Sequence, residues 1–113
     1  MIIPNIEARN RVEINYKNAI EQSQELKKVA ESLRKRASEL DQLRDEIRFI
    51  WKGHNAERFS LRTAEKADEI RNTASRAAEI ADAIRQTAEI YRNAELASIA
   101  QSENVMPPGS DGS

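Results

Sequence analysis

Apolar residues recur every seven positions in two long runs that no proline or glycine interrupts. Stepping alternately four and three residues from Val12 reaches twelve positions, ten of them apolar. They are Val12, Tyr16, Ala19, Ser23, Leu26, Ala30, Leu33, Ala37, Leu40, Arg44, Ile47 and Trp51. The same stepping later in the chain reaches Ala67, Ile70, Ala74, Ala77, Ala81, Ile84, Ala88 and Tyr91. A sustained seven-residue repeat places these positions on one helical face, so the sequence predicts two long helices that share a seam.

Capping residues stand at the ends of both runs. Asn5, after a proline, can accept hydrogen bonds from the first amides of a helix, and Glu7 suits the positive end of the helix dipole. Gly53 can adopt the left-handed conformation just past the first helix. Asn55 is the predicted cap of the second helix, with Glu57 in its first turn. The chain therefore reverses at Gly53.

The predicted fold class is all-α, an antiparallel helix-turn-helix hairpin. The hairpin is expected over residues 1–103, with helix one at about 5–52, the turn at 51–54 and helix two at about 55–101. Residues 104–113 contain two of the three prolines and two of the three glycines. We expect this C-terminal tail to be disordered.

A second apolar stripe lies beside the seam, and one hairpin cannot bury both. Its residues are Val29, Leu43, Ile50, Phe59 and Ile80. A two-helix hairpin that left them exposed would have too little core for independent stability. We therefore expect dimerisation into a four-helix bundle, either with a second copy or with a similar helical hairpin.

Charge and composition exclude several classes of partner and chemistry. The 113 residues include 18 basic and 19 acidic side chains, so the net charge of −1 gives no overall attraction for nucleic acid or an anionic membrane. Cysteine is absent, and the one histidine, His54, has no second His or Cys with which to form a metal site. No nucleophile is assembled with a base, and there is no phosphate-binding loop. We expect a protein that is not an enzyme, with no cofactor and no metal.

The N-terminus and the hydropathy of the chain bear on targeting. The start, M-I-I-P-N-I-E-A-R-N, has neither the basic nor the apolar region of a secretory signal peptide. No apolar run approaches the ~18 residues of a membrane span, so no stable membrane insertion is expected. A signal-independent export route stays open.

Two short motifs stand out from this repetitive background. The stretch F-I-W-K-G-H contains the only tryptophan, Trp51, and places Gly53 two residues after it, at the predicted turn. The stretch Y-R-N-A-E places Tyr91 and Glu95 four residues apart, which puts them on one helical face near the end of helix two. At ~1.5 Å per residue, Tyr91 lies roughly 55 Å from Trp51 of the same hairpin.

With these motifs in a hairpin of about one hundred residues, the chain resembles the WXG family of ESAT-like early secreted antigens of type VII (ESX) secretion. The resemblance covers residues 1 to about 101 and includes the F-x-x-x-x-A stretch from Phe59 to Ala64. It implies a composite export signal in which W-x-G of one subunit lies beside Y-x-x-x-[D/E] of its partner. The residues that match are Trp51, Gly53, Tyr91 and Glu95.

The resemblance also implies partners and a destination. The partners would be a second hairpin, the type VII export ATPase and, for some members, a larger effector. The protein would be made in the bacterial cytoplasm, secreted without a cleavable signal peptide, and act in virulence or interbacterial competition. Two alternatives stay open: a targeting partner or chaperone for a larger effector, and a cytoplasmic coiled-coil scaffold in which W-K-G is only a turn.

Overall fold

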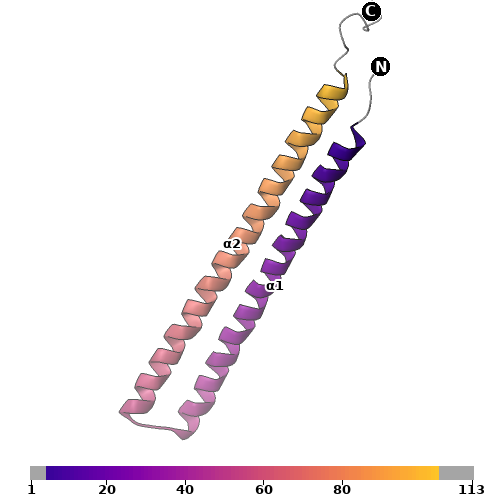
Figure 1. Cartoon of the computed structure of the whole chain (residues 1–113). Coiled ribbons are helices and arrows are strands. Elements are labelled where there is room, and N and C mark those ends of the chain that lie inside the picture. The colour runs from indigo at the N-terminus through magenta and orange to yellow at the C-terminus, as the bar shows by residue number, and fades with distance from the viewer. Residues whose placement is uncertain (1–4, 105–113) are drawn as a thin grey trace, which may run out of the picture. The chain divides into compact units, whose positions relative to one another are not determined.

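The computed structural model describes residues 5–104, which form two α-helices (Figure 1). Helix α1 spans Ile6–Ile50 and helix α2 spans His54–Asn104, joined by a three-residue connection. These bounds lie within three residues of those expected from the sequence. The predicted all-α helical hairpin is confirmed. The tail expected to be disordered, at 104–113, lies outside the described residues apart from Asn104, the last residue of α2.

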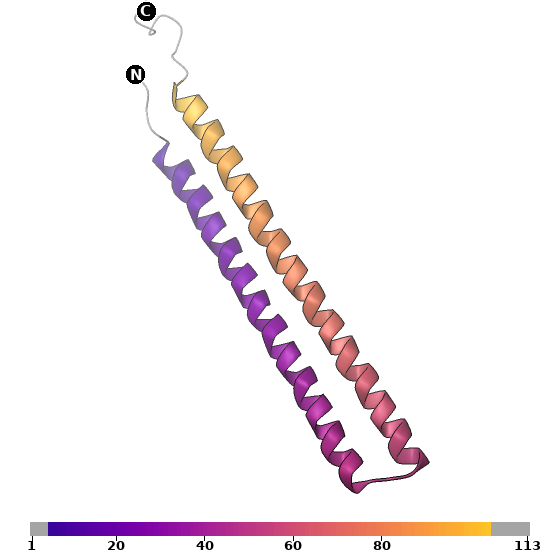
Figure 2. The same cartoon turned by 180° about the vertical axis from the view of Figure 1, so that it is seen from behind.

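The chain divides into two compact units. The terminal unit comprises Met1–Ser23 with Asp82–Ser113, and the turn unit comprises Gln24–Ala81. Within the turn unit, Trp51 contacts Phe59 and Asp41 pairs with Arg71, so the two helical segments run antiparallel. The two helical segments of the terminal unit are also antiparallel, because Arg9 pairs with Glu103 and the later residue Glu13 pairs with the earlier residue Arg92. Figures 1 and 2 show this antiparallel course from opposite sides.

The turn unit has a core made mostly of alanine. Its buried residues are Ala30, Ala37, Ala56, Ala67, Ala74, Ala77 and Ala81. Half-buried leucines from α1 complete the central cluster, with Leu26 and Leu33 packed against Ala30, Ala74 and Ala77. Small residues on α2 let the helix backbones approach closely while the leucines of α1 fill the remaining space. The seam predicted from the seven-residue repeat is confirmed here.

The terminal unit has a smaller buried core. Val12 and Ser23 are buried, and Tyr16, Ala19, Ile84 and Ala88 are half-buried. Tyr91, predicted at the seam, is instead 55% exposed, and Arg92 is half-buried next to it. A straight α-helix drifts by about 20° per heptad against a strict seven-residue repeat, and this drift accumulates between Ala67 and Tyr91. Arg92, the residue after Tyr91, therefore faces α1 in its place.

The helix ends show one confirmed cap and one wrong prediction. The Asn5 side chain accepts a hydrogen bond from the Ala8 amide at 3.1 Å, as expected of an N-cap. Asn55, however, is not the cap of α2. The Gly53 carbonyl accepts from the Glu57 amide at 3.0 Å, so α2 begins at His54 and Asn55 lies inside its first turn.

Candidate recognition site at the turn and on helix two

Trp51 lies at the end of α1 with much of its ring accessible to solvent. Its amide donates to the Ile47 carbonyl at 2.8 Å, which continues the hydrogen bonding of α1 by one residue. Trp51 is 43% exposed, and the centroid of its ring lies 5.7 Å from that of Phe59, with a tilt of 50° between the planes. This tilted aromatic contact holds the ring against the second turn of α2. Trp51 matches the apolar repeat, yet it lies outside the buried seam.

Gly53 makes the reversal possible. Its φ of +110° lies in a region that side chains with a Cβ atom rarely adopt. A Cβ atom added there would meet nothing within 4 Å. The glycine is therefore required by the backbone conformation and not by lack of space. The sequence-based role of Gly53 in the turn is confirmed.

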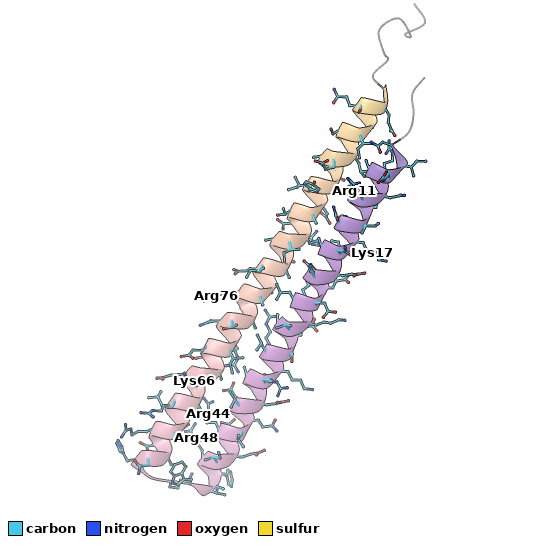
Figure 3. The ribbon with its side chains drawn as sticks, in the orientation of Figure 1. Arg11, Lys17, Arg44, Arg48, Lys66 and Arg76 are labelled. Carbon is cyan, nitrogen blue, oxygen red and sulfur yellow. The ribbon has the colours of Figure 1, made fainter. Side chains whose placement is uncertain are left out.

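A shallow hollow of about 150 Å³ borders the indole ring. Its walls come from the last turn of α1, the connection and the first two turns of α2. The lining residues are Arg48, Trp51, Lys52, Gly53, Ala56, Glu57 and Ser60. The hollow is of a size to receive one side chain of a partner. Arg48 projects from this end of α1 in Figure 3.

Tyr91 and Glu95 lie on consecutive turns of α2 in the terminal unit. Tyr91 is exposed, whereas Glu95 is half-buried. Within residues 5–103 the Glu95 carboxylate takes part in no ion pair or hydrogen bond. The phenol and the carboxylate are therefore both available to a partner. They belong to the terminal unit, whereas Trp51 and Gly53 belong to the turn unit.

Arg92 attaches this part of α2 to α1. Its Nε donates to Glu13 Oε2 at 3.1 Å, a second nitrogen lies 2.8 Å from Glu13 Oε1, and the guanidinium carbon lies 5.1 Å from the centroid of the Tyr16 ring. The hydrogen bond with Glu13 raises the pKa of Arg92. These contacts were not predicted from the sequence. Pairing the charged residues that flank an antiparallel seam could have found them.

Glu103 closes the end of the terminal unit. Its carboxylate accepts from the Asn5 amide at 2.7 Å and pairs with Arg9. The Arg9 hydrogen bond and the Asn5 amide lower the pKa of Glu103. The carboxylate thus supplies an acceptor and a negative charge to the N-terminus of α1 from the other helix.

The apolar stripe is exposed, and all of its residues belong to the turn unit. The exposed fractions are Val29 49%, Leu43 49%, Ile50 84%, Phe59 39% and Ile80 53%. Val29, Leu43, Ile50 and Ile80 each immediately precede a position of the seven-residue repeat, and Phe59 immediately precedes the half-buried Ser60. Positions with the same offset on two antiparallel helices lie on the same side of the pair. The stripe therefore occupies one flank.

The opposite flank of the turn unit is charged. Asp41 follows the seam residue Leu40, and Arg71 follows the seam residue Ile70. These two side chains form an ion pair between the helices, and Arg71 also pairs with Asp68 at 3.1 Å. The hydrogen bond with Asp41 raises the pKa of Arg71. The Asp41–Arg71 pair thus joins the helices on one flank of the turn unit, whereas the other flank carries the five exposed stripe residues between charged side chains such as the paired Lys66 and Glu69.

Among the described residues there is no group of three or more His, Asp or Glu side chains that could hold a metal ion. No helix in that part of the chain is long and apolar enough to cross a membrane. No family model, no curated protein and no solved structure matches this chain.

Proposed function

We propose that the protein is a small, non-enzymatic substrate of a type VII (ESX) secretion system, exported as a folded helical dimer. The observation that carries this proposal is the place of W-K-G. The only tryptophan and a glycine at φ +110° form the connection between α1 and α2, and the indole ring is part exposed. The type VII pathway in this proposal comes from the resemblance to the WXG pattern, which is carried by Trp51, Gly53, Tyr91 and Glu95.

The physical role of each signal residue follows from its environment. Trp51 offers a large apolar face, of the kind that dominates binding energy at interfaces. Gly53 holds the turn, Tyr91 adds an exposed ring, and Glu95 adds a carboxylate with no partner in the described part of the chain. The proposed receptor is the export ATPase, which would read these groups together.

The exposed stripe supports dimerisation. Its five apolar residues lie on one flank, whereas the other flank is occupied by the Asp41–Arg71 pair. We propose that a second copy covers the stripe and completes a four-helix bundle. A head-to-tail arrangement would place Trp51 of one subunit near Tyr91 and Glu95 of the other, and two-fold symmetry would give two such sites.

Export of single variants tests the signal. Trp51→Ala and Glu95→Ala should each reduce secretion into the culture medium while the helical circular-dichroism signal is kept. Leu61→Ala, at another exposed apolar side chain, is the matched control and should be exported normally. Co-expression of the two signal variants should restore part of the export, because one end of the mixed dimer carries an intact site. Normal export of both single variants would refute the proposal.

A second candidate is a targeting partner or chaperone that pairs with the helical domain of a larger effector. The uncovered stripe favours it, because such a domain could cover the same flank. The mass of the purified protein separates the two: a stable homodimer favours the standalone substrate, and a poorly folded monomer favours the obligate partner. Leu43→Glu should dissociate or unfold the complex in either case, because a buried unpaired carboxylate costs several kcal/mol. An unchanged mass and melting temperature would show that the stripe is not the interface.

A further inference from the structure

Three consecutive large apolar side chains are exposed where α1 ends. Phe49 is 86% exposed, Ile50 84% and Trp51 43%. Successive residues of an α-helix point about 100° apart. The three side chains therefore spread around the end of α1, and a helix or groove packed along one side of α1 cannot contact all of them.

Phe49 is accounted for neither by the seam nor by the stripe. It follows the half-buried seam residue Ile47 by two positions, which places it about 200° further round the helix, on the side away from α2. The stripe residue Ile50 is the next residue along the chain and points about 100° further round the helix. A second copy seated on the stripe would leave Phe49 in water, so this ring needs a different environment.

Two basic residues lie among these side chains, and acidic residues lie just outside the segment. Within residues 47–56 there are two formal positive charges, Arg48 and Lys52, and no acidic residue; Glu46 and Glu57 stand just outside this segment. The net charge of the whole chain is −1, so any attraction for an anionic surface is local to the turn. Arg48 and Lys52 also line a second hollow together with Phe49 and Asp45.

We propose that the turn docks peripherally on an anionic lipid surface. Tryptophan and phenylalanine rings favour the boundary between headgroups and acyl chains, and flanking basic side chains gain from anionic headgroups. A lipid interface surrounds the end of the helix, which suits side chains that point in several directions. In the bound state Phe49 and the exposed part of Trp51 enter the interface, and Arg48 and Lys52 contact phosphate oxygens. The proposal does not rest on the export function, although Trp51 is common to both; Phe49, which belongs to neither the stripe nor the proposed signal, tests it separately.

The test uses the purified full chain with two kinds of vesicle. One is phosphatidylcholine alone, and the other is an equal mixture with phosphatidylglycerol. We expect sedimentation with the anionic vesicles, a blue shift of the Trp51 emission and its quenching by brominated acyl chains. Binding should weaken as salt is added, because the attraction is screened.

Variants separate the turn from other exposed apolar positions. Phe49→Ser should lower the partition coefficient by about tenfold, since the ring is transferred from water. Ile14→Ser, at an exposed apolar residue of the terminal unit, is the control and should change it less than about twofold. The Arg48→Glu, Lys52→Glu double variant should abolish the preference for anionic vesicles.

Several outcomes would overturn the proposal. They are no binding to anionic vesicles, equal binding to both vesicle types, and an equal loss in Phe49→Ser and Ile14→Ser. If Phe49→Ser kept vesicle binding but changed the oligomeric mass of the protein, the ring would contact protein and not lipid. Circular dichroism of each variant shows that the helices are retained.

Discussion

Arg92 on α2 holds the Glu13 carboxylate on α1 with two nitrogens, at 3.1 and 2.8 Å. The pair crosses the seam of the terminal unit next to the exposed Tyr91, and both partners are accessible to solvent. Exposed pairs contribute little individually, and salt screens them. The contribution of this pair is therefore best isolated by mutating both partners.

Arg92→Met and Glu13→Gln should each lower the melting temperature slightly, and the double variant should lose less than the sum of the two. The coupling should shrink as salt is added. The reversed pair, Glu13→Arg with Arg92→Glu, should recover part of the stability. Purely additive losses would show that the two side chains do not interact in solution. The Arg85–Glu89 pair within α2, at 3.0 Å, is the control for an ion pair that joins no second helix.

Ala74→Leu should destabilise the protein because Ala74 is fully buried against Ala30 and Ala77. A leucine would force the helices apart or into strained rotamers, at a cost of about 1–3 kcal/mol. Ala83→Leu makes the same change at an exposed position of the same helix and should be nearly neutral. Urea denaturation followed by circular dichroism measures both. Equal stabilities would mean that the alanine seam is loosely packed.

Gly53→Ala should also be destabilising, but through the backbone alone. Nothing lies within 4 Å of the added methyl group, so the cost arises from the φ of +110° and is on the order of 1 kcal/mol. Gly53→Asn should cost less, because asparagine tolerates positive φ better than alanine. A fully stable alanine variant would show that the connection can adopt another conformation.

Glu103→Gln should lower stability at neutral pH and leave it unchanged in acid. The folded-state pKa of Glu103 lies below its ordinary value of 4.5. Its stabilisation is therefore present above that value and is lost as the pH falls through the lowered pKa. Melting temperatures of wild type and variant, measured from pH 7 downward, should converge in that range. Glu65→Gln, at an exposed glutamate, should show no such convergence.

Much of the fold could be predicted from the sequence because it depends on local rules. An uninterrupted apolar repeat, Asn5 as a cap and Gly53 at the reversal define two helices and a turn. The cap of α2 was predicted wrongly, because the first helical hydrogen bond runs from the Glu57 amide to the Gly53 carbonyl and Asn55 lies inside the first turn. Local signals at helix ends overlap, and sequence alone does not decide between neighbouring residues.

The candidate site was harder to predict because exposure depends on the relative rotation of the two helices. Trp51 and Tyr91 match the apolar repeat, yet both are exposed. The accumulated drift of a straight helix turns Arg92 toward α1 in place of Tyr91. Two ion pairs between the helices were also missed, Arg92 with Glu13 and Arg71 with Asp41. They depend on the register in which the two antiparallel helices align, and the apolar repeat of one helix alone does not specify that register.

The contact between Trp51 and Phe59 gives the protein a natural fluorophore at a single known place. Since Trp51 is the only tryptophan, its emission on excitation at long wavelength comes from the connection between α1 and α2 alone. Circular dichroism, in contrast, averages over both helices. If the emission changes before the helical signal during a denaturant titration, the turn opens first. Coincident transitions would show that the turn and the helices unfold as one cooperative system.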